Sequence, residues 1–253
     1  MPIYQVFFLF FEKEIVKESG FAEAYSDTMT VTNHKFLDVS KSIEQSGVFK
    51  PNRGELTPEE VQVGSGKGTI FPVYNLHEVP ENLLKALHSD FNYVLDEGRT
   101  YPMYNTMSFA EFLKSWFVLF VAILIEGSYS SLSDPRLSDK PLEWWEHHLL
   151  GSFYVKSNYA GRCSHVCNGG FVVSHKRRGL GLGKILGLQY LKWAPKLGYI
   201  YSVFNLVFES NIASWKLWDS LGFERIGFIK NSAVLKGESG FQNAIMYGKD
   251  LLS

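Results

Sequence analysis

Hydrophobic and polar positions alternate most regularly in the C-terminal half of the chain. Several runs there have the length and apolar content of strands, namely 149–156, 167–174, 201–209, 223–229 and 244–250. Residues 182–194 and 211–221 instead carry apolar side chains at helical spacing. Strands that alternate with helices in this way predict a mixed α/β sheet with helices on its faces.

The middle of the chain carries clear boundary signals. Residues 69–74 read as a short strand. Pro80 then begins a predicted helix with leucines at helical spacing, and Gly98 ends it. Ser108, followed three residues later by Glu111, predicts a capping box at the start of a second helix.

The longest uncharged apolar run is ten residues long, at 116–125. A membrane-spanning helix needs about 20 residues, so this run predicts a buried strand over 116–126. A loop is expected at 127–141. Trp144 and Trp145, which follow it, are expected to be packing aromatics on the loop that covers the sheet.

The first 66 residues are weakly periodic. A helix is possible at 39–45, and residues 46–54 are rich in turn formers. We therefore expect one domain at 67–253, with residues 1–66 as an extension packed on it. The start of the chain lacks the basic segment and the small-residue cleavage site of a signal peptide.

Composition narrows the function classes. With 253 residues, 45% of them hydrophobic, the chain can bury about 70–75% of its surface, which excludes a disordered protein. The 25 basic and 26 acidic residues nearly cancel, so neither a nucleic acid nor a membrane surface is an expected partner. Only two cysteines are present, which favours a reducing, cytoplasmic compartment.

The most informative motif is the glycine-rich stretch Arg178-Gly-Leu-Gly-Leu-Gly183, between a predicted strand and a predicted helix. Glycines let a ligand approach the backbone closely. The start of the helix then presents free N–H groups and a positive dipole end. Lys176 and Arg177 add charge beside Arg178. The stretch therefore predicts a diphosphate site, although it lacks the G-x-G-x-x-G spacing of a dinucleotide fold.

A second motif follows about 30 residues later, at Asn211-IASWKLWDSL-Gly222-Phe223. Together with R-x-x-G-x-G it resembles the GCN5-related N-acetyltransferase (GNAT) superfamily. The resemblance implies a central, twisted, mostly antiparallel sheet whose strands 167–174 and 201–209 splay apart. It also implies that acetyl-CoA lies in the gap as co-substrate, that its diphosphate sits on the glycine-rich loop, and that no metal is needed.

Longer stretches are similar to the fungal MPR-type proline-analogue N-acetyltransferases. They are FPVYNLHEVPENLL, GRTYP, NYAGRCSHVCNGGF, LKWAPKLGYIYSVFNLVFESNIASWKLWDSLGFERIG and AIMYGKDL, together within residues 68–252. The resemblance implies acetylation of azetidine-2-carboxylate or of a glutamate-semialdehyde or pyrroline-type metabolite. It also implies detoxification, protection from oxidative stress, and a homodimer.

The same resemblance assigns the site residues. The asparagines of C-N-x-G-F and F-N-L-V-F fall on Asn168 and Asn205, as catalytic and substrate-binding residues, with Leu206 beside the latter and Asn211 as a further contact. Asparagine offers a donor and an acceptor without fixed charge, which suits an amino acid acceptor. Asn211 also reads as the N-cap of the following helix.

The alternation of the strand around Asn205 predicts two faces. One carries Asn205, Val207 and Glu209, and the other carries Phe204, Leu206 and Phe208. The apolar set is expected to face the core beneath the helices.

The acetyl-CoA site implied by the resemblance has two parts. The backbone contacts come from the first splayed strand, at Phe171, Val172 and Val173. The other contacts come from the glycine-rich loop, at Arg178, Gly179, Gly181 and Gly183, and from Asn211 at the start of the next helix. Many GNAT enzymes carry a tyrosine that protonates the leaving thiolate four residues before Gly-Phe. This chain has Trp218 there, which is no acid. The candidates for the general base are His165, Glu209 and water.

Other motifs favour different chemistry only weakly. Gly64-Ser-Gly-Lys-Gly lacks the first glycine of a P-loop, since Val61 stands there, and no apolar strand precedes it. Cys163 and Cys167 lack the further ligands of a zinc site and a triad that would activate a nucleophile. Three alternatives stay open, namely a GNAT enzyme for another small amine, one for a peptide N-terminus, and a non-catalytic acyl-CoA-binding protein.

Overall fold

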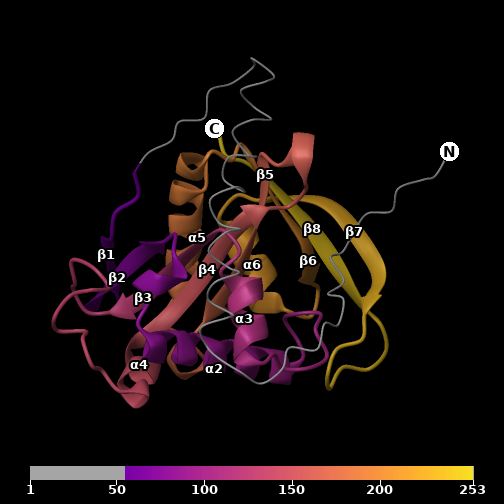
Figure 1. Ribbon diagram of the computed structural model, residues 1–253. Coiled ribbons are helices and arrows are strands. Elements are labelled where there is room, and N and C mark those ends of the chain that lie inside the picture. The colour runs from indigo at the N-terminus through magenta and orange to yellow at the C-terminus, as the bar shows by residue number, and fades with distance from the viewer. Residues whose placement is uncertain (1–54, 253) are drawn as a thin grey trace.

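A computed structural model describes residues 55–252, as one mixed sheet between two layers of helices (Figure 1). The sheet has eight strands in the order β1-β2-β3-β4-β5-β6-β8-β7. Their bounds are β1 Glu59–Val63, β2 Gly66–Val73, β3 Phe120–Glu126, β4 Leu149–Ser157, β5 Val166–Val173, β6 Tyr201–Phe208, β7 Glu224–Ala233 and β8 Gln242–Asp250. Every pairing is antiparallel except that of β5 with β6. The predicted mixed fold with a mostly antiparallel sheet is therefore confirmed.

The helices cover both faces of the sheet. Their bounds are α2 Glu81–Glu97, α3 Phe109–Trp116, α4 Leu142–His148, α5 Leu182–Trp193 and α6 Ile212–Ser220. Short 3₁₀ turns lie at Leu76–Glu78, Gly161–Cys163, His175–Arg177 and Pro195–Leu197. One core cluster joins α2, α3 and α4 to the sheet, and the other joins α5 and α6 to the opposite face. Strand alternation separates the two, so that Ile70 belongs to one cluster and Phe71 to the other.

The boundary signals in the middle of the chain are confirmed. Pro80 is the N-cap of α2, and Gly98 ends that helix in the left-handed conformation at φ 65°, which glycine adopts without strain. Ser108 and Glu111 form the predicted capping box of α3, because each side chain bonds the backbone N–H of the other.

Two predicted strand and loop assignments are wrong. Residue 116 ends α3, and β3 begins only at Phe120, because the Phe117 N–H still bonds the Leu113 carbonyl and so closes the last turn of the helix. Trp144 and Trp145 lie on α4 and not on a loop. This helix has seven residues, about two turns, which is too short for a helical period to show in the sequence.

Residues 59–63 form a strand that the sequence analysis did not predict. β1 pairs with β2 from Glu59↔Ile70 to Val63↔Gly66. It lies at the edge of the sheet, where one face meets water and polar residues are tolerated. Gly64 and Ser65 are therefore the turn of a hairpin. The expected boundary at 66/67 falls within this hairpin, while the possible helix at 39–45 lies outside the described residues.

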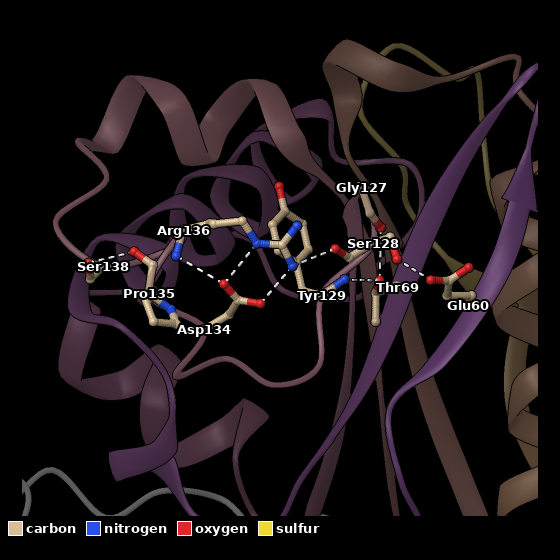
Figure 2. A network of polar contacts seen from close by, with 9 residues as sticks. All are labelled: Glu60, Thr69, Gly127, Ser128, Tyr129, Asp134, Pro135, Arg136 and Ser138. Atoms are coloured by element: carbon tan, nitrogen blue, oxygen red, sulfur yellow. Dashed lines mark hydrogen bonds and ion pairs between the residues drawn. The ribbon is translucent and has the colours of Figure 1, made fainter.

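The segment 127–141 is a loop, as predicted, and polar contacts hold its shape (Figure 2). The Asp134 carboxylate accepts hydrogen bonds from the backbone and the guanidinium of Arg136, which holds the pKa of this carboxyl far below its usual range. Arg136 also donates to the Ser128 carbonyl. Thr69 Oγ1 donates to the Gly127 carbonyl and accepts from the Tyr129 N–H, so β2 anchors the start of the loop.

The core position of Trp145 gives a test of this description. Its side chain is 1% exposed, so Trp145→Ala removes a fully packed indole. We expect the free energy of unfolding to fall by about 3–5 kcal/mol. The matched control is the half-buried neighbour, Trp144→Ala, whose cost should be less than half of that. Urea denaturation of both variants measures the difference, and equal losses would contradict the different burial of the two indoles.

Candidate functional site

A gap opens in the sheet between β5 and β6. The two strands pair only at Val166↔Tyr201 and Cys167↔Ser202, although each continues for six more residues. This confirms the predicted splay. Beyond Cys167, the backbone groups of β5 that point away from β4 have no strand to bond.

The alternation of β5 shows which groups these are. The Ser174 N–H donates to the Leu150 carbonyl on the β4 side at 3.0 Å, so residues of the same parity, Val172 among them, turn their backbone groups toward β4. Phe171 and Val173 have the other parity and face the gap. Of the three predicted backbone contacts, this geometry favours Phe171 and Val173 over Val172.

The connection between α2 and α3 crosses the open end of the gap. Tyr101 Oη donates to the Phe171 carbonyl at 3.1 Å, and burial raises the pKa of this tyrosine well above its ordinary value, so it remains a donor. Thr100 Oγ1 accepts a long bond of 3.5 Å from Asn211 Nδ2. Tyr101 was not predicted as a site residue. The one feature of the sequence that could have pointed to Tyr101 is its place in GRTYP, one of the stretches that carry the family resemblance.

The glycine-rich loop has the open backbone that an anion site needs. Gly179 and Gly181 lie in the left-handed region at φ 84° and 72°, and a Cβ at either would meet nothing within 4 Å. Gly181 is the N-cap of α5, and no side chain of residues 55–252 caps that helix start. Its first N–H groups could therefore bind an anion. A Cβ at Gly183 would meet only Leu217, at 3.4 Å.

The basic residues beside this loop do not stand free. Each pairs with a carboxylate, Lys176 with Glu146, Arg177 with Glu126 and Arg178 with Glu97. Arg178 makes two bonds of 2.7 Å to Glu97, which raises the pKa of the guanidinium and lowers that of the carboxyl. The three basic side chains thus add positive charge beside the loop, as predicted, but each is paired with a carboxylate. The unpaired donors at this loop are the backbone N–H groups at the start of α5, which no side chain of residues 55–252 caps.

Three asparagine side chains meet at the narrow end of the gap. Asn168 Nδ2 donates to Asn158 Oδ1 at 3.2 Å and to the Val203 carbonyl at 3.0 Å. Asn205 Nδ2 donates to Asn158 Oδ1 at 2.6 Å, and Asn158 Nδ2 returns a bond of 3.3 Å to Asn205 Oδ1. The structure thus brings Asn168 and Asn205 together. The sequence analysis missed Asn158, which only begins the quoted motif NYAGRCSHVCNGGF.

The predicted faces of β6 are wrong, because the strand contains a β-bulge. Phe204 pairs with Tyr247 and Val207 with Ile245, so three steps on β6 match two on β8. Phe204 and Val207 consequently share the α5–α6 core, while Leu206 and Phe208 belong to a separate small cluster. Asn205 and Leu206 form the bulge itself, which breaks the period-2 rule for the residues around them.

Asn211 is an N-cap, as predicted. Its Oδ1 accepts a hydrogen bond from the Ser214 N–H at 3.2 Å at the start of α6. Its Nδ2 reaches Thr100. A direct contact of Asn211 with a ligand stays a prediction.

Trp218 is a packing residue. It is 5% exposed, and its indole N–H donates to Ser214 Oγ at 3.0 Å. Its ring centroid lies 4.9 Å from that of Phe171 and 4.5 Å from that of Phe204. The indole therefore fills the space beneath the gap, and its N–H is already bonded.

Within residues 55–252, neither side chain considered as a base is hydrogen-bonded to Asn158, Asn168 or Asn205. Glu209 follows the end of β6, and its carboxylate accepts a bond from Asn243 at 2.9 Å. His165 precedes β5, where its carbonyl accepts from the Ile200 N–H.

The two cysteines are free thiols in the structure. Cys167 is fully buried and lies 3.1 Å from Tyr190 Oη. Burial raises the pKa of this thiol to about 12, which leaves it protonated and unreactive. In the described part of the chain, no three His, Cys, Asp or Glu side chains gather as a metal site would require. No helix among those residues has the length and apolar character of a membrane span.

Comparison with known proteins points the same way. Residues 129–223 match the Acetyltransferase (GNAT) family. The fission yeast protein N-acetyltransferase aca1 is 42% identical over 167 residues, which cover 66% of this chain and 79% of that protein. Protein SPT10 of Saccharomyces cerevisiae is 28% identical over 229 residues, 77% of this chain and 36% of that protein.

Solved structures show the same fold. A GCN5-related N-acetyltransferase from Kribbella flavida aligns at a TM-score of 0.58 and 20% identity, over 72% of this chain and 97% of that one. The acetyltransferase yncA from Salmonella typhimurium, solved with its cofactor acetyl-CoA, aligns at 0.53 and 13%, over 72% and 94%. The expected fold class is therefore confirmed by these neighbours as well.

Gly183 allows a test of the anion site. A glutamate there should weaken the binding of coenzyme A by more than about 100-fold, because its carboxylate repels the diphosphate at the free N–H groups. Calorimetric titration of Gly183→Glu, Gly183→Gln and Gly183→Ala separates charge from size. The glutamine should have an intermediate effect and the alanine a small one.

The fold provides the control for this series. An acidic residue in the first turn of a helix is stabilising, so thermal unfolding of Gly183→Glu should not occur below that of the parent protein. If folded Gly183→Glu protein binds coenzyme A with unchanged affinity, the assignment of the diphosphate site to this loop is wrong.

Proposed function

This chain belongs to the GNAT family of acetyltransferases, and from that premise we propose that its acceptor is a small, proline-like amino acid. It is an acetyl-CoA-dependent N-acetyltransferase. The observation that carries the proposal is the meeting of Asn158, Asn168 and Asn205 at the narrow end of the gap. Azetidine-2-carboxylate and a pyrroline-type metabolite are the acceptors that the sequence resemblance implies.

The chemistry of the cluster supports such an acceptor. An amino acid brings a carboxylate, which needs donors, and a nitrogen whose N–H needs an acceptor. Three neutral amides supply both. A polyamine acceptor would favour carboxylates at this place, yet the hydrogen bonds among these three side chains and the Val203 carbonyl involve no acidic group in the described part of the chain.

The residues present fit acetyl-CoA. The Phe171 and Val173 N–H groups face the gap, and the open loop at Gly179–Gly183 offers the N–H groups of a helix start. These two regions would hold the pantetheine arm and the diphosphate. When bound, acetyl-CoA supplies an activated acetyl thioester.

The protein then contributes position more than acid–base chemistry. We assign direct transfer, since Cys167 is buried against Tyr190 and, within residues 55–252, no base is hydrogen-bonded to the thiol of Cys163 or of Cys167. A lysine-like amine, with a pKa of about 10.4, must lose a proton before attack, and an asparagine cannot take it. Because, within residues 55–252, neither Glu209 nor His165 is hydrogen-bonded to Asn158, Asn168 or Asn205, we assign that proton to water. Trp218 is no acid, so water also protonates the leaving thiolate.

The proposed cellular role is detoxification of proline analogues and protection from oxidative stress, in the cytoplasm and as a homodimer. The sequence resemblance supports the detoxification role, the protection from oxidative stress and the homodimer, and the low cysteine count supports the cytoplasm. Size-exclusion chromatography with light scattering tests the dimer.

A thiol-release assay tests the acceptor. The panel holds imino acids, ordinary amino acids, polyamines and a peptide with a free N-terminus, each with acetyl-CoA. We expect azetidine-2-carboxylate to give a kcat/KM at least about 10-fold above that of any polyamine or peptide. A clear preference for a polyamine or for the peptide would reject the proposed acceptor and leave the acetyltransferase activity standing.

Alanine variants of the two predicted asparagines should differ in kind. Asn205→Ala removes binding that ground and transition states share, so KM for the acceptor should rise about 10-fold or more while kcat changes little. Asn168→Ala loosens the position of the nucleophile, so kcat should fall about 10- to 100-fold. Saturation kinetics measure both. Full kcat/KM in both variants would place the acceptor elsewhere.

A further inference from the structure

The orientation of the three asparagine amides follows from one backbone carbonyl. Carbonyl oxygens only accept hydrogen bonds, so the group of Asn168 that lies 3.0 Å from the Val203 oxygen must be its Nδ2. The same Nδ2 lies 3.2 Å from Asn158. Asn158 must therefore present its Oδ1 to Asn168.

The orientation of the Asn158 amide also fixes that of Asn205. Since Asn158 Oδ1 is fixed, the group of Asn205 that lies 2.6 Å from it must be Nδ2. The remaining contact, at 3.3 Å, then joins Asn158 Nδ2 to Asn205 Oδ1. Asn205 is held by two reciprocal bonds with Asn158, one donated by each amide, and is therefore unable to flip without losing both.

A count of donors and acceptors shows what the cluster leaves for a ligand. Each amide has two N–H donors. Both donors of Asn168 are used, and among residues 55–252 no donor reaches its Oδ1. Asn158 and Asn205 each use one donor within the cluster and keep the second. The cluster therefore offers an acceptor at Asn168 and donors at Asn158 and Asn205.

We propose that Asn158 is a positioning residue that sets which chemical groups the acceptor site recognises. Through its paired bonds it holds Asn205 with an N–H available for the acceptor's carboxylate, and it leaves Asn168 Oδ1 for the acceptor's N–H. A secondary amine as free base has one N–H and one lone pair. One bond to Asn168 fixes the N–H and leaves the lone pair to attack. This inference rests on the proposed acceptor class.

The test uses two acceptors that differ only in the carboxylate, azetidine-2-carboxylate and azetidine. Asn158→Asp keeps an oxygen that accepts from Asn168 and Asn205 but places a negative charge beside the carboxylate site. We expect kcat/KM for azetidine-2-carboxylate to fall about 10- to 100-fold, mainly through KM. The value for azetidine should change less than about threefold. An equal loss for both acceptors, or none for either, would overturn the inference.

A matched control separates this local charge from a general one. Asn82→Asp adds the same charge at the start of α2. Within residues 55–252, the single hydrogen bond of Asn82 Nδ2 goes to the Lys140 carbonyl. Lys140 precedes β4, whereas Asn158 follows the end of that strand. The ratio of the two acceptors should stay at the parent value. A similar change of the kcat/KM ratio in Asn82→Asp would overturn the inference that the charge at position 158 acts locally on the carboxylate site.

A double-mutant cycle tests the positioning role itself. Asn158→Leu removes the paired bonds without adding charge. If Asn158 acts through Asn205, the KM effects of Asn158→Leu and Asn205→Ala should not add, and the double variant should resemble Asn205→Ala within about threefold. Additive effects would mean that Asn158 acts independently, which overturns the proposal.

Side-chain amide NMR keeps the inference testable if the acceptor class is wrong. Failure of the parent protein to acetylate azetidine-2-carboxylate would reject the proposed function alone. In that case, Asn158→Leu should still shift and broaden the Asn205 amide signals. The Asn168 amide proton that is bonded to the Val203 carbonyl should keep its chemical shift. Unchanged Asn205 signals in the folded variant would overturn the role of Asn158.

Discussion

The separation of β5 from β6 is the constraint on which the rest of this structure depends. After two residue pairs the strands part, although an unpaired backbone group inside a protein costs free energy comparable to a lost hydrogen bond. Aromatic packing holds them apart. The rings of Phe171, Phe204 and Trp218 lie with centroids 4.5–5.8 Å from one another beneath the gap, so closing the strands would displace a buried cluster.

The two ends of the gap satisfy their polar groups differently. At the narrow end, Asn168 Nδ2 reaches the Val203 carbonyl and so replaces, with a side chain, the strand bond that is missing there. At the wide end Tyr101 serves the Phe171 carbonyl, while the N–H groups at the start of α5 have no side-chain cap. A ligand laid along the gap thus meets free donors at one end and an ordered amide cluster at the other.

Local chemistry explains which parts of this arrangement the sequence predicted. Pro80 acts through its fixed φ, Gly98 through its left-handed backbone and Ser108 through its capping bond. Each acts on its own neighbours, so its effect can be predicted from the sequence. The same holds for the glycine-rich loop. The bulge in β6 is not, because it exists only against β8, and the polar β1 becomes a strand only beside β2.

Asn158 shows the same limit within the site. Its significance comes from two partners that lie 10 and 47 positions away in the sequence, on two other strands. The resemblance located Asn168 and Asn205, but no spacing rule marks the residue between them. Likewise, three consecutive basic residues indicated added positive charge, and only the fold shows that a carboxylate pairs with each of them.

The pairing of Arg178 with Glu97 does not conflict with a diphosphate at the loop. The two side chains are 47% and 30% exposed, and ion pairs near the surface contribute at most about 1 kcal/mol. Exchanging Glu97 for two phosphate oxygens would therefore cost little, because Arg178 can bond two oxygens of either partner. Among residues 55–252, no side chain caps the N–H groups at the start of α5. A diphosphate bound at this loop would therefore gain mainly from the backbone, while Arg178 fastens the loop to Glu97 at the end of α2.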